Sequence, residues 1–190
     1  MNFENIPLGR HAPGVINVVV ETPKGSRNKY RYDPKRRRFV VEYKLGIPVP
    51  VDYGWVPQTL GVNGEPLEAM VVSRFSTRPG YVCQARPIGA LKQKDGEHKL
   101  ICVMLGDDRY IRVQDIYDLD NKTLKRIVAF FEPFFEFDGW MSKEEAYKLI
   151  KEAHERYMES KPKEESDAAG DDKVEREGMD RADRSDAPAE

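Results

Sequence analysis

Short apolar segments separated by turn residues fill positions 15–104, and this pattern limits the folds open to the chain more than any other feature. The segment 15–21 (Val-Ile-Asn-Val-Val-Val-Glu) is rich in β-branched residues, which favour strands. We expect further strands at 30–32, 39–43, 69–72, 81–91 and 100–105. The turns between them are expected at Asp33-Pro34, Asn63-Gly64 and Asp95-Gly96. Many short strands joined by turns predict a small closed β-barrel.

Two helices are expected after the strands. Asn121 is a predicted N-cap, followed by apolar residues at helical spacing as far as Phe131, and Pro133 ends or kinks this helix. The sequence Ser142-Lys143-Glu144-Glu145 fits a capping box and opens a second helix that ends near Glu159. We expect this helix to pack on the barrel.

The charge distribution divides the chain. Residues 161–190 contain eleven acids, six bases and no aromatic residue, so they cannot bury enough apolar surface to offset the entropy of ordering. The sequence predicts one domain over residues 1–160 and a disordered, net acidic tail over 161–190. An acidic binding tail is the functional alternative.

Several features point to the cytoplasm. No run of 18 apolar residues is present, so we expect no membrane span. The first residues lack a basic stretch followed by an apolar one, and a secretory signal is therefore not expected. Without export, Cys83 and Cys102 are interpreted as reduced core thiols.

Carboxylates and cations lie close together in the middle of the chain. Glu65 and Glu68 stand three residues apart at the start of an apolar strand, and Asp95, Glu97 and Lys99 follow within forty residues. Carboxylates hold hard divalent metals and cations hold phosphate, so such a chain can bring the two together. The competing interpretation is that acids near turns simply face water.

The segment Lys24–Arg38 is strongly basic, with eight Lys or Arg and one acid, Asp33. It is either a solvated hairpin or an anion-binding patch. Because Tyr30, Tyr32 and Tyr43 interleave with these cations, a single-strand nucleic-acid binder is a further alternative, although nucleic acid is the less favoured partner.

A set of motifs in fixed order resembles the metal-dependent, barrel-fold family of soluble inorganic pyrophosphatases over roughly residues 3–157. The motifs are Glu21, Lys29-Tyr30, Val51–Trp55, Asn63–Glu68, Arg86–Leu91, Asp95–Leu100 and Phe130–Glu132. The resemblance implies an α+β fold: a five-stranded OB-like β-barrel with two C-terminal flanking helices. It also implies diphosphate as substrate, Mg2+ as cofactor (Mn2+ possible), and a homo-oligomer, usually a hexamer in bacterial members.

The resemblance assigns roles to individual residues. The implied metal ligands are Glu21, Asn63, Glu65, Glu68, Asp95 and Glu97. The implied substrate-binding residues are Lys29, Arg31, Lys44 and Lys99. Glu65 matches the base that helps to activate water, and Tyr53 matches a tyrosine of the site.

The chain also departs from the family pattern. Four metal-binding aspartates of the family appear here as Asn63, Glu65, Glu68 and Glu97. A phosphate-gripping tyrosine–lysine pair is replaced by two phenylalanines, at 134 and 135. Asparagine removes a negative charge, and glutamate adds one carbon–carbon bond, about 1.5 Å of reach. On aromaticity alone, we expect both phenylalanines to be core residues.

Arg31 stands where the family usually has a glutamate, and Lys44 is the nearest match to a family arginine. The added cation at Arg31 could partly replace lost ones, or could simply be a surface residue. Beside a magnesium-dependent diphosphatase and the less favoured nucleic-acid binder, the sequence thus leaves two alternatives open. One is a catalytically impaired phosphate-binding or assembly protein. The other is a phosphohydrolase for an organic phosphate, because fewer cations and a more apolar pocket suit an organic leaving group.

Overall fold

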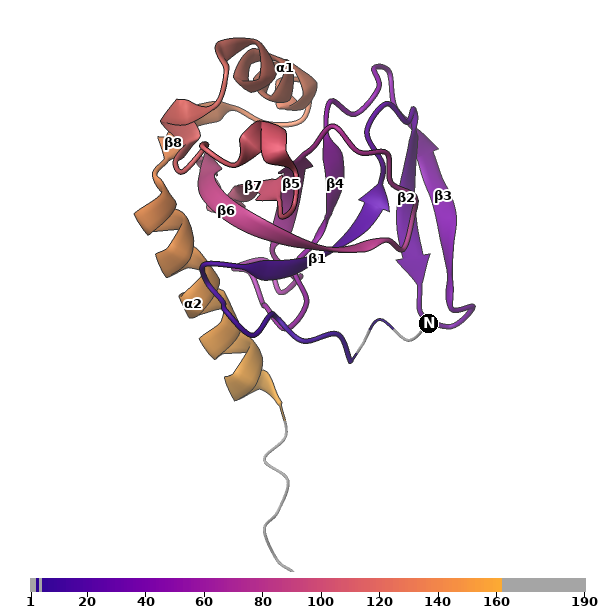
Figure 1. The fold of residues 1–190 in the computed structure, drawn as a ribbon. Helices are drawn as coiled ribbons and strands as arrows, with labels where there is room; N and C mark the ends of the chain where they lie inside the picture. The colour runs from indigo at the N-terminus through magenta and orange to yellow at the C-terminus, as the bar shows by residue number, and fades with distance from the viewer. Residues whose placement is uncertain (1–2, 4, 162–190) are drawn as a thin grey trace, which may run out of the picture.

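The computed structural model describes residue 3 and residues 5–161, and its centre is a closed five-stranded barrel (Figure 1). The strands follow one another around the barrel in the order β1 (Ile16–Thr22), β4 (Asp52–Trp55), β5 (Glu68–Val72), β7 (Lys99–Met104) and β6 (Val82–Gln93). Strand β6 pairs with β1 again and closes the ring. All pairs are antiparallel except β5–β7. The predicted five-stranded barrel with flanking helices is confirmed.

Three further strands lie outside the ring. Strands β2 (Asn28–Asp33) and β3 (Arg38–Lys44) form a separate antiparallel hairpin on one side of the barrel (Figure 1). Strand β8 (Phe137–Met141) pairs with β6. Sequence analysis missed β4 and β8, because each is only four or five residues long and contains a glycine, which weakens a strand signal.

The barrel strands are buried on both faces. In β5, Ala69 and Val71 belong to one apolar cluster, while Met70 and Val72 belong to a second. This alternation follows from the two-residue period of a strand. Helix α2 (Lys143–Ser160) adds Ala146, Ile150 and Ala153 to the first cluster, and helix α1 (Asn121–Phe131) adds Ile127, Phe130 and Phe131 to the second. The two helices thus cover different parts of the barrel (Figure 1).

Side-chain caps fix the starts of both helices. The N-cap of α1 is Asp120 rather than the predicted Asn121; its carboxylate accepts a hydrogen bond from the Thr123 amide at 2.9 Å. The predicted capping box at Ser142 is confirmed, with reciprocal bonds between Ser142 and Glu145 of 3.3 and 2.7 Å. Two short 3-10 helices, η1 (Asp108–Tyr110) and η2 (Ile116–Asp118), precede α1.

Three other expectations concern the membrane, the tail and the cysteines. No helix in residues 5–161 is both long and apolar enough to cross a membrane. The predicted acidic tail lies, from residue 162 onward, outside the described residues, so the division at residue 160 stays a prediction. Cys83 and Cys102 are buried and unbonded, as expected of core thiols.

Gly54 allows β1 and β4 to approach closely. Its backbone faces Val20, and a Cβ at this position would fall against the Val19 carbonyl oxygen and 2.9 Å from the Val20 Cα. We expect Gly54→Ala to lower the free energy of unfolding by about 3 kcal/mol, because rigid backbone would have to move. Urea unfolding measures this loss. Gly46→Ala, which meets nothing within 4 Å, is the control and should change stability by less than about 0.5 kcal/mol; equal effects would contradict the prediction.

Candidate functional site

A cavity of about 680 Å³ lies between the β2–β3 hairpin and the barrel. Its charged lining residues are the carboxylates Glu21, Glu42, Glu65, Glu68 and Glu97 and the cations Lys29 and Arg31. Asn63 and Tyr53 line it as well. The structure therefore brings together most of the residues that the sequence singled out, although they come from β1, β2, β4, β5 and two loops.

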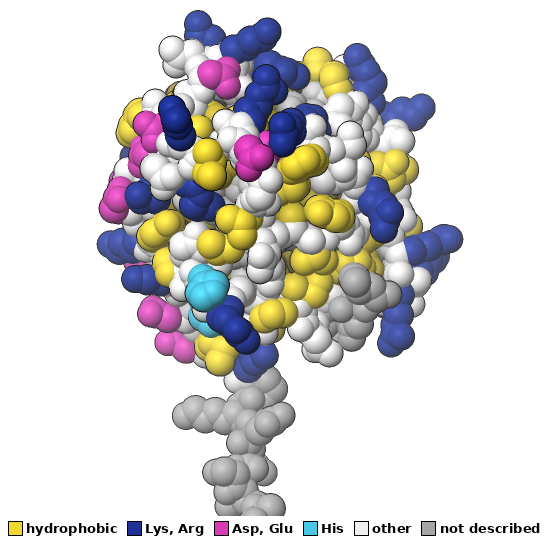
Figure 2. All heavy atoms as spheres, in the orientation of Figure 1, with side chains coloured by type: hydrophobic (Ala, Val, Ile, Leu, Met, Phe, Trp, Pro, Cys, Tyr) yellow, Lys and Arg dark blue, Asp and Glu magenta, His cyan; other side chains and the backbone are white. Residues whose placement is uncertain are grey.

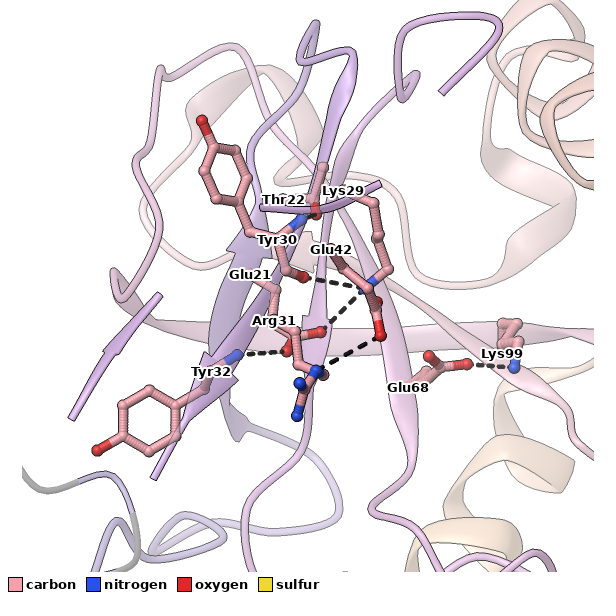
Figure 3. Close-up of polar contacts among 9 residues, drawn as sticks. All are labelled: Glu21, Thr22, Lys29, Tyr30, Arg31, Tyr32, Glu42, Glu68 and Lys99. Carbon is pink, nitrogen blue, oxygen red and sulfur yellow. Dashed lines mark hydrogen bonds and ion pairs between the residues drawn. The ribbon is translucent and has the colours of Figure 1, made fainter. Parts of the chain in front are cut away.

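A β-bulge presents Glu21 to the cavity. The register between β1 and β4 shifts between Val20 and Thr22, so Glu21 is the extra residue of the bulge. Its carboxylate pairs with the Lys29 ammonium at 3.1 Å and accepts a longer bond from the Tyr32 amide at 3.4 Å (Figure 3). Burial raises the pKa of Glu21 above its ordinary value of 4.5, and the charge of Lys29 opposes that rise.

Glu68 and Lys99 form a second pair at the starts of the parallel strands β5 and β7 (Figure 3). The phenol of Tyr53 is buried beside Glu68. Burial, followed by the charge and hydrogen bond of Glu68, raises the pKa of Tyr53 well above 10. Because the phenol stays protonated at neutral pH, Tyr53 is a hydrogen-bond donor in the site. The Lys29 ammonium lies 4.6 Å from the centre of its ring.

The loop before β5 carries an exposed acid of the site, Glu65. The Asn63 side-chain oxygen accepts a hydrogen bond from the Glu65 amide at 3.0 Å, which shapes the turn. The Glu65 carboxylate itself is exposed and lines the cavity. Glu65 is therefore free to meet a ligand, while the amide oxygen of Asn63 is engaged by the backbone.

Two predicted residues lie apart from the others. Asp95 accepts a hydrogen bond from the Glu97 amide at 2.9 Å and shapes the β6–β7 turn; Glu97, not Asp95, lines the cavity. Lys44 is exposed at the end of β3, where it faces Asn28 across the hairpin, and it does not line the cavity. Their predicted roles in metal and substrate binding remain predictions.

Arg31 and Glu42 form an ion pair of 3.4 Å at the cavity edge, and both side chains are largely exposed (Figure 3). Sequence analysis missed Glu42. The register of the hairpin shifts between Lys29 and Tyr30, and Glu42 lies opposite that shift. An alternating pattern cannot reveal a side chain that a bulge turns toward another face. Arg31 is thus a surface residue that nevertheless lines the cavity.

The two phenylalanines after Pro133 do not behave alike. Phe135 packs against the second apolar cluster, with its ring 4.9 Å from that of Phe131. Phe134 is 57% exposed, so the expectation that both are core residues is wrong for this one. It lies in the turn after α1, where its amide donates a hydrogen bond to the Phe131 carbonyl at 2.7 Å.

The donor chemistry of the cavity fits a hard divalent metal. Glutamate carboxylates are the oxygen ligands that magnesium and manganese prefer. Within residues 5–161, no three His, Cys, Asp or Glu side chains already surround one point. Instead, Lys29 and Lys99 neutralise Glu21 and Glu68. A metal bound by these carboxylates would compete with the two lysines for them.

The basic residues do not form one continuous groove on the face in view. Figure 2 shows Lys and Arg side chains dispersed around its periphery, with acidic side chains and apolar surface among them. On the hairpin itself, Arg36 pairs with Asp33 at 2.7 Å. This arrangement suits a solvated hairpin more than a nucleic-acid channel.

Comparisons with known proteins agree with this fold. A sequence profile described as "Inorganic pyrophosphatase" matches residues 18–158. The inorganic pyrophosphatase of Synechocystis is 36% identical over 169 residues, covering 83% of this chain and 99% of the relative. That of Corynebacterium glutamicum is 39% identical and covers 75% and 98%. The crystal structure of the Thermus thermophilus enzyme matches with a TM-score of 0.78 and 32% identity, covering 83% of this chain and 99% of that one.

The barrel with two flanking helices and a carboxylate-lined cavity is therefore the scaffold of a phosphoanhydride hydrolase. The chain belongs to the inorganic pyrophosphatase family. The resemblance inferred from the sequence motifs is confirmed.

The Glu21–Lys29 pair should stabilise the metal-free fold in a pH-dependent way. We expect Lys29→Met to cost about 2 kcal/mol at pH 7, because a buried carboxylate loses its counter-charge. Without Lys29 the Glu21 pKa rises further above its ordinary value of 4.5. When the pKa of an acid is raised in the folded state, the fold is destabilised above the unfolded-state value of 4.5, and the loss is complete only above the raised pKa; the loss should therefore shrink as pH falls toward 4.5.

Urea unfolding in the presence of a chelator, at several pH values, measures this difference. Lys92→Met is the matched control, since the Lys92–Asp138 pair is exposed and should contribute less than about 1 kcal/mol. A loss for Lys29→Met that does not change with pH would contradict the expected role of Glu21.

Proposed function

We propose that this chain hydrolyses diphosphate to two phosphates in the cavity between the hairpin and the barrel. Membership of the family supports the activity. The observation that carries the proposal for this chain is the shared lining: four glutamates that match metal-binding positions surround the same space as Lys29 and Arg31. A highly charged substrate needs cations to hold it and oxygen donors for its metal.

Each side chain has a proposed task. Glu65, exposed on its loop, accepts the proton of the attacking water. Lys29, Lys99 and Arg31 hold phosphate oxygens as ion pairs, and Lys44 would do so only at the edge of the site. Tyr53 donates a hydrogen bond, because burial keeps its pKa well above 10 and its phenol protonated. In the ligand-free structure the two lysines are held by glutamates and are thus positioned at the cavity in advance.

Enzymes of this family depend on a metal, and we propose magnesium, with manganese as a substitute. The metal would be held by the carboxylates of Glu21, Glu65, Glu68 and Glu97. Asn63 would contribute its amide oxygen, and Asp95 would bind the metal only from the edge of the site. When bound, the metal supplies an acidified water and neutralises phosphate charge. Glutamates stand at three positions where the family has aspartates, and each side chain is longer by one carbon–carbon bond. The protein must accommodate this extra length, because magnesium requires near-ideal octahedral coordination.

We also propose a cytoplasmic homo-oligomer, a hexamer by family resemblance. Buried, unbonded Cys83 and Cys102 suit a reducing compartment. Exposed apolar side chains such as Ile111 and Val62, each 65% exposed, offer surface that an oligomer could cover.

Phosphate release from diphosphate tests the activity, measured with magnesium, with manganese and with chelator. We expect metal-dependent release that Glu65→Ala lowers by about a hundredfold, as for the loss of a general base. Lys29→Ala should also lower it strongly by removing a phosphate contact. Glu159→Ala and Lys148→Ala, both on the exposed face of α2, are the matched controls. Release no greater than in Glu65→Ala would instead support a phosphate-binding or assembly protein without turnover.

Asn63→Asp should strengthen magnesium binding, since it restores a negative charge beside the other carboxylates. One added charge about 4 Å from a divalent ion is worth about 2 kcal/mol in a watery site, or about thirtyfold in the dissociation constant. Calorimetric titration of magnesium into the chelator-treated protein measures the change. Asn121→Asp, exposed on α1, should leave the affinity unchanged. Equal affinities of Asn63→Asp and the unaltered protein would remove residue 63 from the metal site.

A further inference from the structure

A second, smaller cavity adjoins the charged one. Its volume is about 180 Å³, and its apolar walls are Leu45, Val49, Phe130, Phe131, Phe134 and Phe135. Lys29, Tyr43 and Tyr53 line both cavities, so the two spaces meet at these side chains. Lys99 lines the smaller cavity too. The smaller cavity is therefore an apolar space beside the charged one, with the Lys29 ammonium between the two and Lys99 in the wall of the smaller one.

The composition of this space does not suit inorganic diphosphate. Every atom of that substrate is polar, and it would leave the aromatic walls against water. Phe134 is 57% exposed, so its ring offers apolar surface that no apolar group of the described residues covers fully. Phe130 and Phe131 pack edge to face behind it at 5.1 Å between ring centres, which makes the back wall rigid. An aromatic wall beside cations matches a ligand that is apolar at one end and anionic at the other.

The volume limits the size of the apolar part. An engineered cavity of about 150 Å³ lined by apolar side chains binds benzene. The present cavity of about 180 Å³ thus accommodates one aromatic ring or a branched alkyl group of about five carbons. Lys29 and Lys99 then lie where the attached phosphate groups would emerge into the charged cavity.

We propose that the site also takes organic diphosphates, R–O–PO2–O–PO3, in which R is one aromatic ring or a short branched alkyl group. This inference deepens the proposed function, because the phosphates would occupy the same charged cavity. The organic group fills the smaller cavity against Phe134 and Phe131. The inner phosphate lies at Lys29 and Lys99, and the terminal phosphate lies among the carboxylates.

The reaction follows from this placement. The oxygen of water forms a bond to the terminal phosphorus, and the bond from that phosphorus to the bridging oxygen breaks. The electron pair stays on the bridging oxygen, which becomes part of the organic monophosphate. The products are R–O–PO3 with two negative charges, hydrogen phosphate and one proton, which Glu65 accepts and releases to solvent. No oxidant or reductant is required.

Binding of two organic phosphates that differ only in R tests the inference without requiring turnover. Phenyl phosphate fills the apolar cavity, while methyl phosphate carries the same charge without the ring. We expect calorimetry with magnesium present to give an affinity for phenyl phosphate at least about tenfold higher than for methyl phosphate. Phe134→Ala should lower that ratio at least about fivefold, whereas Phe75→Ala should preserve it. Phe75 is a suitable control because it is also exposed, at 41%, and lines neither cavity.

Equal affinities for the two phosphates would overturn the inference, and so would a preference that survives Phe134→Ala. Hydrolysis of inorganic diphosphate, measured separately in the same preparation, tests the proposed function. Hydrolysis of inorganic diphosphate with no preference for phenyl phosphate would retain the function and reject the organic ligand. A preference for phenyl phosphate without hydrolysis of inorganic diphosphate would reject the function and retain the ligand class.

Discussion

Strand β1 is hydrogen-bonded on both edges, to β4 and to β6, and this double pairing fixes the positions of the groups around the cavity. The ring closes only because β1 completes it, and the central residues of β1 are fully buried. At the end of the pairing with β4 the register slips by one residue, and the bulge turns Glu21 away from the barrel wall. The carboxylate then meets Lys29 of the hairpin. The same strand, β1, therefore closes the barrel and carries Glu21 of the site.

The charges of the cavity are balanced in pairs. A carboxylate next to another carboxylate in a partly buried space raises the free energy of both unless cations lie between them. Glu21 has Lys29, Glu68 has Lys99, and Glu42 has Arg31. Glu65 stays exposed to water. These pairs allow the fold to form without ligand. In the proposed function, phosphate oxygens would take the cations as partners and a metal would take the carboxylates.

The changes beside the cavity alter what it can hold. Where the resemblance expects a tyrosine and a lysine, Phe134 and Phe135 supply aromatic carbon, and the rings of α1 continue that surface inward. The charged cavity and the apolar one share Lys29 and Tyr53. Retained cations with an added apolar wall favour a ligand with two ends of different polarity, which inorganic diphosphate lacks.

The sequence by itself determined the barrel and both helices, because hydrophobic period, β-branching, turn pairs and capping residues are local signals that agree with one another. It also indicated Glu65, Glu68 and Lys99 by their spacing, and Glu21 and Lys29 by resemblance.

Only the tertiary structure decided the rest. Strands β4 and β8 are too short to be recognised locally, and their partners stabilise them. The bulges that present Glu21 and Glu42 arise from strand pairing, which no single segment encodes. Phe134 and Phe135 are chemically identical, yet one is exposed and the other packed, since burial depends on what the remainder of the chain places beside each ring.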